Sequence, residues 1–342
     1  MSEFFQAISD GKRNGPMLAA WVIEGSAAGS RALFGYGETG YTQQYRDEAF
    51  PADIADEIRG MPPEKAGIFE SKGNRVFLDR IPGKRKLVRC GAGHVALAVI
   101  RICAMLDFEI TAIEDREEYA QKAREAGAHH VICQPFGEAL DGIPGDWSTA
   151  FVIMTREHQY DMECLRRILR KTYAYAGMMG SRSRTDQIRE RMLEEGYDSR
   201  KVAELHMPIG LAIGSRTPEE IAVSVAAELI RIINEADCGE GFPEGMAEEL
   251  AEQPRGVLAM IVEKHGEAPR KPGTKMLVRE DGSFRGTVGG RTAEAAMLRT
   301  AEKMIRDGER DSRLIRIAMK EGTMYCGGDL TVFLLPLGGN EA

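Results

Sequence analysis

Residues 86–96 read Lys-Leu-Val-Arg-Cys-Gly-Ala-Gly-His-Val-Ala, and this stretch decides the fold of the middle of the chain. An apolar strand leads into two glycines, Gly91 and Gly93, and an apolar helical pattern follows. This order matches the G-x-G-x-x-[G/A] turn, which directs backbone N–H groups and a helix dipole at a phosphate. Asp115 lies 22 residues beyond Gly93, at the end of the next expected strand, where an acid would meet a ribose hydroxyl.

A tight strand-to-helix turn also needs small residues, so the glycines alone are compatible with a purely structural turn. His94 is unusual in such a turn, because its bulk and its titratable ring would lie at the mouth of the site. We therefore expect His94 to touch a ligand.

Strands and helices alternate along the chain from the strand that enters this turn. We expect strands over 86–90, 109–113, 129–133, 149–154 and 173–178, with helices over 95–106, 117–126 and 161–169 between them. This alternation is typical of a parallel sheet covered on both faces, the Rossmann-like α/β class. A last helix begins at Thr217-Pro218-Glu219-Glu220, which combines an N-cap hydroxyl, a first-turn proline and a capping-box glutamate.

Turn residues and charge divide the chain. Pro82-Gly83 is a strong turn signal, and 234–254 carries seven acids without a Lys or Arg. We expect an α+β domain over 1–84, the Rossmann-like domain over 85–236, a solvated acidic linker over 237–254 and a second α+β domain over 255–342. The smaller domains thus flank the parallel sheet.

The amino-terminal domain resembles a degenerate copy of the last one. Leu18 parallels Leu258, Gly29 parallels Gly273, and Val76 parallels Val332, each within a short apolar segment. If this duplication is real, an ungapped match places Glu70 opposite Cys326, so that the first copy has lost the thiol.

Composition excludes several classes of function. Asp and Glu outnumber Lys and Arg by 53 to 45, so the net charge of −8 gives no general attraction to nucleic acid or to anionic lipid. Six cysteines without C-x-x-C spacing fit neither a disulfide framework nor a zinc finger, and a reducing cytoplasm is the simplest setting. We expect neither a targeting segment nor a membrane span.

Two further groups of residues could carry chemistry. The first lies where the later strands should end, at the carboxyl edge where α/β sheets bind ligands; its candidates are His158, Ser181, Arg182 and His206. The second lies in the last domain, at Gly289, Gly290, Glu294 and Cys326. The glycine pairs there let a backbone approach a ligand, and Cys326 is either an accessible thiol or a small core residue.

These groups together resemble the xanthine dehydrogenase accessory factor family, XdhC/CoxI. The resemblance covers most of residues 85–338. In the Rossmann-like part it rests on Gly91-Ala92-Gly93-His94-Val95-Ala96, Gly180-Ser181-Arg182, 206–210 and 214–222. In the last domain it rests on 268–273, 276–278, Gly286-Thr287-Val288-Gly289-Gly290, Glu294 and Cys326-Gly327-Gly328. Arg291 and Thr292 depart from the glycine-rich continuation that is common in the family. The family's small domain usually precedes the dinucleotide fold, whereas here the intact motifs follow it and the amino-terminal copy lacks them.

The resemblance implies a cytoplasmic accessory factor, without turnover of its own, that binds molybdenum cofactor and helps its sulfurated form reach a xanthine dehydrogenase-type hydroxylase. It implies a sulfur donor as a further partner and a homo-oligomeric assembly. Cys326 would supply the thiol for molybdenum or sulfur, and Arg182 would lie beside the pterin phosphate. Two other classes stay open: an NAD(P)-dependent oxidoreductase that uses the Gly91 turn, and a binding module whose Rossmann-like domain is structural.

Overall fold

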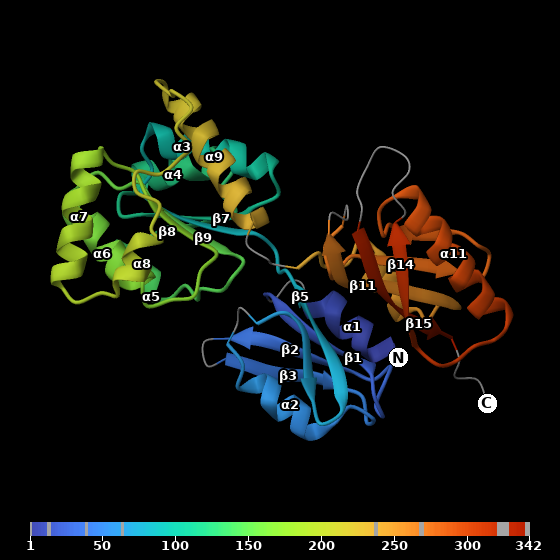
Figure 1. The fold of residues 1–342 in the computed structure, drawn as a ribbon. Helices are drawn as coiled ribbons and strands as arrows, with labels where there is room; N and C mark the ends of the chain where they lie inside the picture. Colours follow the sequence, from blue (N-terminus) through green and yellow to red (C-terminus); the bar gives the residue numbers. More distant parts are fainter. Residues whose placement is uncertain are drawn as a thin grey trace. The chain divides into compact units, whose positions relative to one another are not determined.

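The computed structural model describes residues 2–11, 15–37, 40–62, 65–235, 239–266, 270–319 and 328–338. The chain forms two compact units (Figure 1). One is Lys84–Cys238, and the other combines Met1–Gly83 with Gly239–Ala342. The first boundary follows Pro82-Gly83, the turn that the sequence indicated.

The unit Lys84–Cys238 is built on a parallel five-stranded sheet in the order β10-β9-β6-β7-β8. Its helices cover both faces, with α3 and α9 on one and α5, α6 and α7 on the other (Figure 1). This is the predicted Rossmann-like α/β fold. The elements are β6 (Lys86–Cys90), α3 (His94–Met105), β7 (Glu109–Glu114), α4 (Glu117–Glu125), β8 (His130–Cys133), α5 (Phe136–Asp141), β9 (Thr149–Ile153), α6 (His158–Ile168), β10 (Tyr175–Met178), α7 (Arg182–Glu194), α8 (Ser199–Ala203) and α9 (Pro218–Glu235).

The capping box at the start of α9 is confirmed. The Glu220 backbone N–H donates to Thr217 Oγ1 at 3.2 Å, and the Glu220 carboxylate accepts from the N–H groups of Arg216 and Thr217. The apolar face that follows, with Val225 and Leu229, packs into the core.

Thr217→Ala is expected to lower the free energy of unfolding by about 1 kcal/mol, because one N–H at the helix start loses its acceptor. Urea unfolding followed by circular dichroism measures the loss. Thr217→Ser keeps the acceptor and should stay close to the wild type; equal losses in both variants would show that the hydroxyl contributes nothing.

The second unit holds two sheets with the same strand order, β3-β2-β1-β5-β4 and β13-β12-β11-β15-β14, and every pairing is antiparallel. Each copy runs helix, three strands, helix, two strands. The first copy is α1 (Ser2–Gly11), β1 (Met17–Glu24), β2 (Arg31–Gly37), β3 (Gly40–Arg46), α2 (Ala52–Arg59), β4 (Gly67–Ser71) and β5 (Asn74–Ile81). The second is α10 (Met246–Ala251), β11 (Gly256–Gly266), β12 (Lys275–Arg279), β13 (Phe284–Gly286), α11 (Arg291–Arg306), β14 (Arg313–Met319) and β15 (Gly328–Leu337).

Local details repeat as well, and they correct the expected alignment of the first strand. A bulge follows Val22 in β1, and the Gly29 N–H donates to the Val22 carbonyl at 2.8 Å. A bulge likewise follows Ile261 in β11, and the Gly273 N–H donates to the Ile261 carbonyl at 2.7 Å. Val22 therefore corresponds to Ile261, which places Leu18 opposite Val257 instead of Leu258. A slip of one residue exchanges the two faces of a strand, so the apolar match alone could not detect the error.

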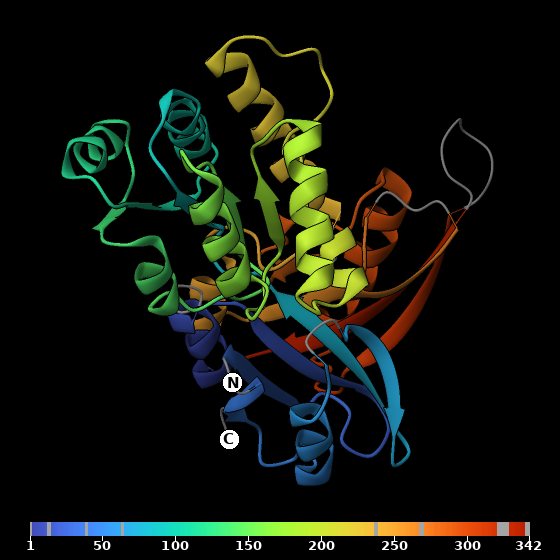
Figure 2. The ribbon, with the colours of Figure 1, turned by 90° about the vertical axis from the view of Figure 1, so that its left-hand side faces the viewer.

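The expected match of Glu70 with Cys326 is also wrong. In the first copy, Glu70 pairs across the strands with Arg75. Thr331 is the counterpart of Arg75 in the second copy, and it pairs with Arg316. Glu70 therefore corresponds to Arg316. Strands β4 and β5 meet through the two residues Lys72-Gly73, a tight turn visible in Figure 2. The first copy therefore has no counterpart of the segment 320–327, which lies outside the described residues and contains Cys326.

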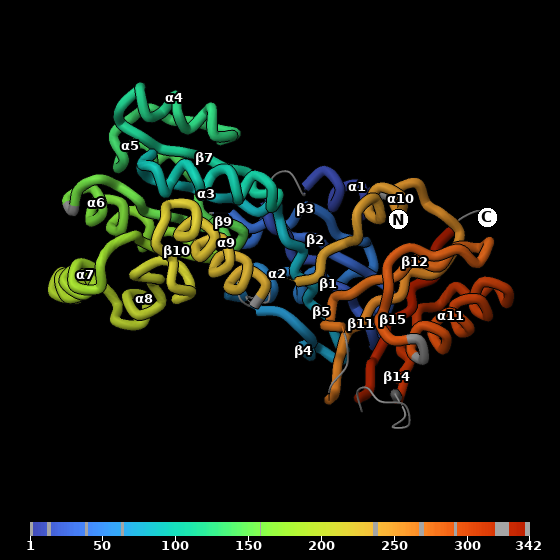
Figure 3. Tube along the Cα trace, turned by 90° about the horizontal axis from the view of Figure 1, so that it is seen from above, coloured from blue at the N-terminus to red at the C-terminus, as the bar shows by residue number. Residues whose placement is uncertain are grey.

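The acidic segment differs from the solvated linker that we expected. Phe242, Met246 and Leu250 recur every four residues and are buried in the core that both copies share. Helix α10 lies beside α1 (Figure 3). The acidic residues lie at other positions of the same segment. Counting charges therefore predicted a solvated linker and missed the narrow apolar face of the helix.

One buried ion pair joins the two copies. The Lys275 ammonium of β12 lies 2.8 Å from the Asp79 carboxylate of β5, and both side chains are almost fully buried. The same ammonium donates to the carbonyls of Gly241 and Gly273 and lies over the Phe242 ring. Burial raises the pKa of Asp79 even with this cation beside it.

Candidate functional site

The carboxyl edge of the parallel sheet brings the first two groups of predicted residues into one region. Strands β6, β7, β9 and β10 all end there, because they run in the same direction. The strand order reverses between β6 and β9, and α/β sheets bind ligands at such a switch point.

The two glycines of the Gly91 turn have different roles. Gly91 has φ +99°, and a Cβ there would lie 2.2 Å from the carbonyl oxygen of Met154. Gly93 has φ −70° and ψ 175°, which any residue adopts, and a Cβ there would meet no atom of the described residues within 4 Å. Gly91 therefore packs the turn against β9, whereas Gly93 leaves open space.

The N-terminus of α3 has no side-chain cap among the described residues. Gly93 is its N-cap, whereas the Ser181 hydroxyl caps α7 and the Thr217 hydroxyl caps α9. His94 is exposed at the first position of α3. The first turn of α3 thus offers uncapped N–H groups at the switch point.

Asp115 lies at the expected strand end, but a partner that the sequence analysis did not assign already binds it. Arg156 donates from its two terminal nitrogens to the two carboxylate oxygens at 2.7 and 2.9 Å. This hydrogen bonding lowers the pKa of Asp115 to about 2. The guanidinium also lies 4.6 Å from the centre of the Tyr160 ring. A ribose hydroxyl at Asp115 would have to compete with Arg156.

The strand-end group around α7 separates into supporting and exposed residues. Arg184 pairs with the buried carboxylate of Asp161, which also accepts from the Thr155 hydroxyl at 2.5 Å. Arg184 therefore has a structural partner. Ser181 and Arg182 are both exposed at the start of α7. His158 is the first residue of α6, and its side chain lies outside the described part.

His206, which is half-buried, joins a network with two buried side chains that the sequence did not indicate. Its ring stacks on Tyr175 with 4.6 Å between centroids, and its Nδ1 lies 3.5 Å from the Glu228 carboxylate. Glu228 also accepts from the Tyr175 hydroxyl at 2.6 Å and from the Gly210 N–H at 2.8 Å. Burial opposes ionisation of Glu228, but the hydrogen bonds that its carboxylate accepts lower the pKa of Glu228 overall. Burial and the neighbouring Glu228 carboxylate both raise the pKa of Tyr175. The network holds the 206–210 segment beside β10.

The third predicted group lies in the unit that contains the two copies. Gly290 is the N-cap of α11, and the Thr287 hydroxyl binds the Glu294 carboxylate and accepts from the Gly289 N–H. Glu294 therefore holds the glycine turn in place. Cys326 lies outside the described residues, as does Cys238. We expected Cys90, Cys103, Cys133 and Cys164 to be packing residues; the first two and Cys164 are buried, whereas Cys133 is only half-buried.

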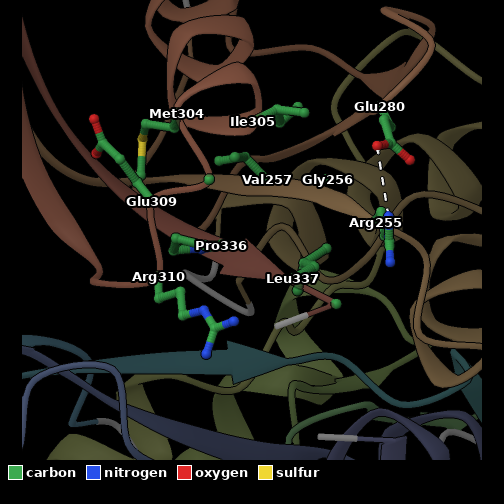
Figure 4. A pocket seen from close by; sticks show the side chains of 12 residues that line it. Arg255, Gly256, Val257, Glu280, Met304, Ile305, Glu309, Arg310, Pro336 and Leu337 are labelled. Carbon is green, nitrogen blue, oxygen red and sulfur yellow. Dashed lines mark ion pairs between the residues drawn. The ribbon is translucent and has the colours of Figure 1, made fainter. Parts of the chain in front are cut away.

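A hollow of about 270 Å³ in the second copy contains none of the predicted residues (Figure 4). It lies at the C-terminal end of α11, whereas Gly289 and Gly290 precede its N-terminal end. Its lining mixes charges, with Arg255 3.8 Å from Glu280. Within the described ranges no three His, Cys, Asp or Glu side chains gather as metal ligands. No helix in the same ranges has the length and apolar character to cross a membrane.

Family models match both parts of the chain that carry the predicted motifs. The XdhC Rossmann domain matches residues 87–229, and the XdhC and CoxI family matches residues 250–317. This chain belongs to the XdhC/CoxI family. The matches fall on the Gly91 turn in one unit and on the Gly289-Gly290 turn in the other.

Individual relatives match only part of the chain. The uncharacterized protein YqeB of Escherichia coli K12 is 33% identical over 169 residues, covering 48% of this chain and 30% of YqeB. A protein of Bacillus subtilis 168, named as a probable component of xanthine dehydrogenase, is 28% identical over 156 residues, covering 46% of this chain and 45% of the relative. The chain thus matches less than half the length of these two curated relatives. A crystal structure titled a xanthine dehydrogenase from Bacillus halodurans is 22% identical, with a TM-score of 0.44, covering 67% of this chain and 62% of that one.

Proposed function

We propose that this protein binds molybdenum cofactor and assists the maturation of a xanthine dehydrogenase-type hydroxylase. Family membership and the Bacillus subtilis relative named as a probable xanthine dehydrogenase component support this role. The observation that carries the binding proposal is the open Gly93 turn, where the uncapped N-terminus of α3 lies at the switch point of the sheet. The partners would be the hydroxylase and a sulfur donor, in a reducing cytoplasm, with the factor as a homo-oligomer.

The described residues fit the phosphate end of the cofactor. The N–H groups at the start of α3 would hold the pterin phosphate, and the exposed Arg182 offers a cation at the same sheet edge. When bound, the cofactor supplies the molybdenum chemistry that the client hydroxylase needs. The residue proposed for the metal and sulfur end is Cys326, whose thiolate is a soft ligand.

A nicotinamide dinucleotide is the second candidate ligand. The Gly91 turn and Asp115 lie where such a ligand places its diphosphate and its ribose. The two hydrogen bonds from Arg156 to Asp115 count against a dinucleotide, because a ribose hydroxyl would meet a carboxylate that already has a partner. Titration with NAD⁺ and NADP⁺ separates this function from cofactor delivery.

Cys326→Ser is expected to leave the melting temperature nearly unchanged and to abolish activation of the client hydroxylase. Serine keeps nearly the same volume but provides no soft thiolate. The assay measures hydroxylase activity after incubation with the purified factor, together with thiol labelling of the native protein.

Cys103→Ser is the matched control. The Cys103 thiol is fully buried, and burial raises its pKa to about 12, so it should resist labelling and contribute to stability instead of activation. Resistance of Cys326 to labelling, or normal activation by Cys326→Ser, would contradict the proposed role of this thiol.

A further inference from the structure

Arg89 is a buried cation without a hydrogen-bond partner in the middle of the Rossmann-like unit. It lies on the central strand β6, two residues before Gly91, and its exposed fraction is 0%. None of its three guanidinium nitrogens has a hydrogen-bond partner in the described part of the protein. Burial lowers the pKa of Arg89 to about 10, so the side chain remains charged at neutral pH. A buried, unsatisfied charge is costly and calls for a partner.

The register of the sheet shows where this charge lies. Arg89 pairs laterally with Ala112 and Val152, and both belong to the core beneath α3 and α9. Side chains paired across a parallel sheet share a face, so Arg89 points to the face that α3 covers. The guanidinium interacts electrostatically with Glu114, the last residue of β7. The cation thus lies near the carboxyl edge, behind the Gly91 turn.

The carboxylates at this edge already have other partners. Glu114 lies 2.9 Å from Arg116 and 3.7 Å from Arg156, and Arg156 also holds Asp115. Arg116 and Arg156 therefore take up both carboxylates, and the Arg89 guanidinium has no hydrogen bond to either of them in the described residues. The next acid, Glu157, lies 3.4 Å from Arg156, but its side chain is half exposed and screened by water.

We propose that Arg89 is the electrostatic anchor of the Gly91 turn and draws the phosphate of a ligand to the free N-terminus of α3. The side chain acts through its field from within the core, where the effective dielectric constant is low, and does not need to contact the ligand. The proposal rests on the same site as the proposed function and specifies the chemistry of the ligand as a phosphate ester or a diphosphate. Both molybdenum cofactor and a dinucleotide carry such a group.

The test compares Arg89→Met and Arg89→Leu, which remove the charge, with Arg89→Lys, which keeps it. ADP and inorganic pyrophosphate are the probes, and titration calorimetry measures their dissociation constants. Both neutral variants should weaken binding by about tenfold, because the loss of one charge close to a partly buried anion has an effect of this order. Their melting temperatures without ligand should equal or exceed that of the wild type, because an uncompensated buried charge has been removed. Arg89→Lys should stay close to wild-type affinity.

Arg167→Met is the control for net charge. Arg167 pairs with Asp141 near the C-terminal end of α6, away from the carboxyl edge, so its loss should not change the affinity. Unchanged ADP affinity in the neutral Arg89 variants, or unfolding of both, would overturn the proposal, since Arg89 would then be irrelevant to binding or required for folding itself.

Measuring retained molybdenum cofactor in the same variants separates this inference from the proposed function. Arg89-dependent binding of ADP without any retention of pterin supports the anchor and contradicts the proposed function. Retention of pterin in equal amounts by the wild type and Arg89→Met supports the function and contradicts the anchor.

Discussion

Gly93→Val is expected to weaken the binding of phosphate-bearing ligands by roughly a hundredfold or more while the protein stays folded. The backbone at Gly93 lies in the extended region, and a Cβ there meets no atom within 4 Å in the part of the chain that the structure describes, so valine fits without strain. Its branched side chain would fill the space that a phosphate needs to reach the N–H groups of α3. Loss of two charge-assisted hydrogen bonds, at about 1.5–3 kcal/mol each, accounts for this magnitude.

Gly91→Ala is the contrasting variant in the same turn. A methyl group at Gly91 would lie 2.2 Å from the Met154 carbonyl oxygen, and φ of +99° is unfavourable for alanine. This variant should lose stability, whereas Gly93→Val should lose binding only. Thermal melting and titration with ADP distinguish the two effects. Wild-type affinity in Gly93→Val would show that ligands do not approach α3 through this space.

Lys275→Met is expected to destabilise the unit of two copies by about 3–5 kcal/mol, the largest stability effect we predict. The change leaves the Asp79 carboxylate buried without its cation, and the carbonyls of Gly241 and Gly273 lose their donor. Urea unfolding monitored by Trp21, which is buried in the shared core, measures the loss.

The duplication supplies a repair and a control for this prediction. Leu335 occupies the position of Asp79 in the second copy, so Asp79→Leu combined with Lys275→Met should recover most of the lost stability. Arg31 is the counterpart of Lys275, and its partner Asp47 is more exposed, so Arg31→Met should cost less. A single Lys275→Met variant as stable as the wild type would show that the buried pair contributes nothing.

The features that could be predicted from the sequence depend on local patterns. Strand-helix alternation around Gly91 predicted the parallel sheet, and Thr217 with Glu220 predicted the capping box, because both depend on residues close together in the chain. The Gly91 turn, Asp115 and Ser181 were placed at one sheet edge by the rule that parallel strands end together.

The features that were missed depend on distant partners. Asp79 and Lys275 lie 196 residues apart, and nothing in either segment indicates the other. Arg89 lies in a strand that also carries Lys86, so its charge does not stand out in the sequence until its isolation in the core is known. Arg156 follows the end of β9, and its pairing with Asp115 depends on the register of β6, β7 and β9.

The most direct test of the proposed function is the molybdenum and pterin content of the protein purified from molybdate-fed cells, compared between the wild type and Gly93→Val. Metal analysis measures molybdenum, and fluorescence after oxidation measures the pterin. We predict that the wild type retains both in similar amounts and that Gly93→Val, at nearly unchanged melting temperature, retains neither. A wild type that carries no pterin, or a Gly93→Val variant that carries as much as the wild type, would contradict the binding of molybdenum cofactor at this turn.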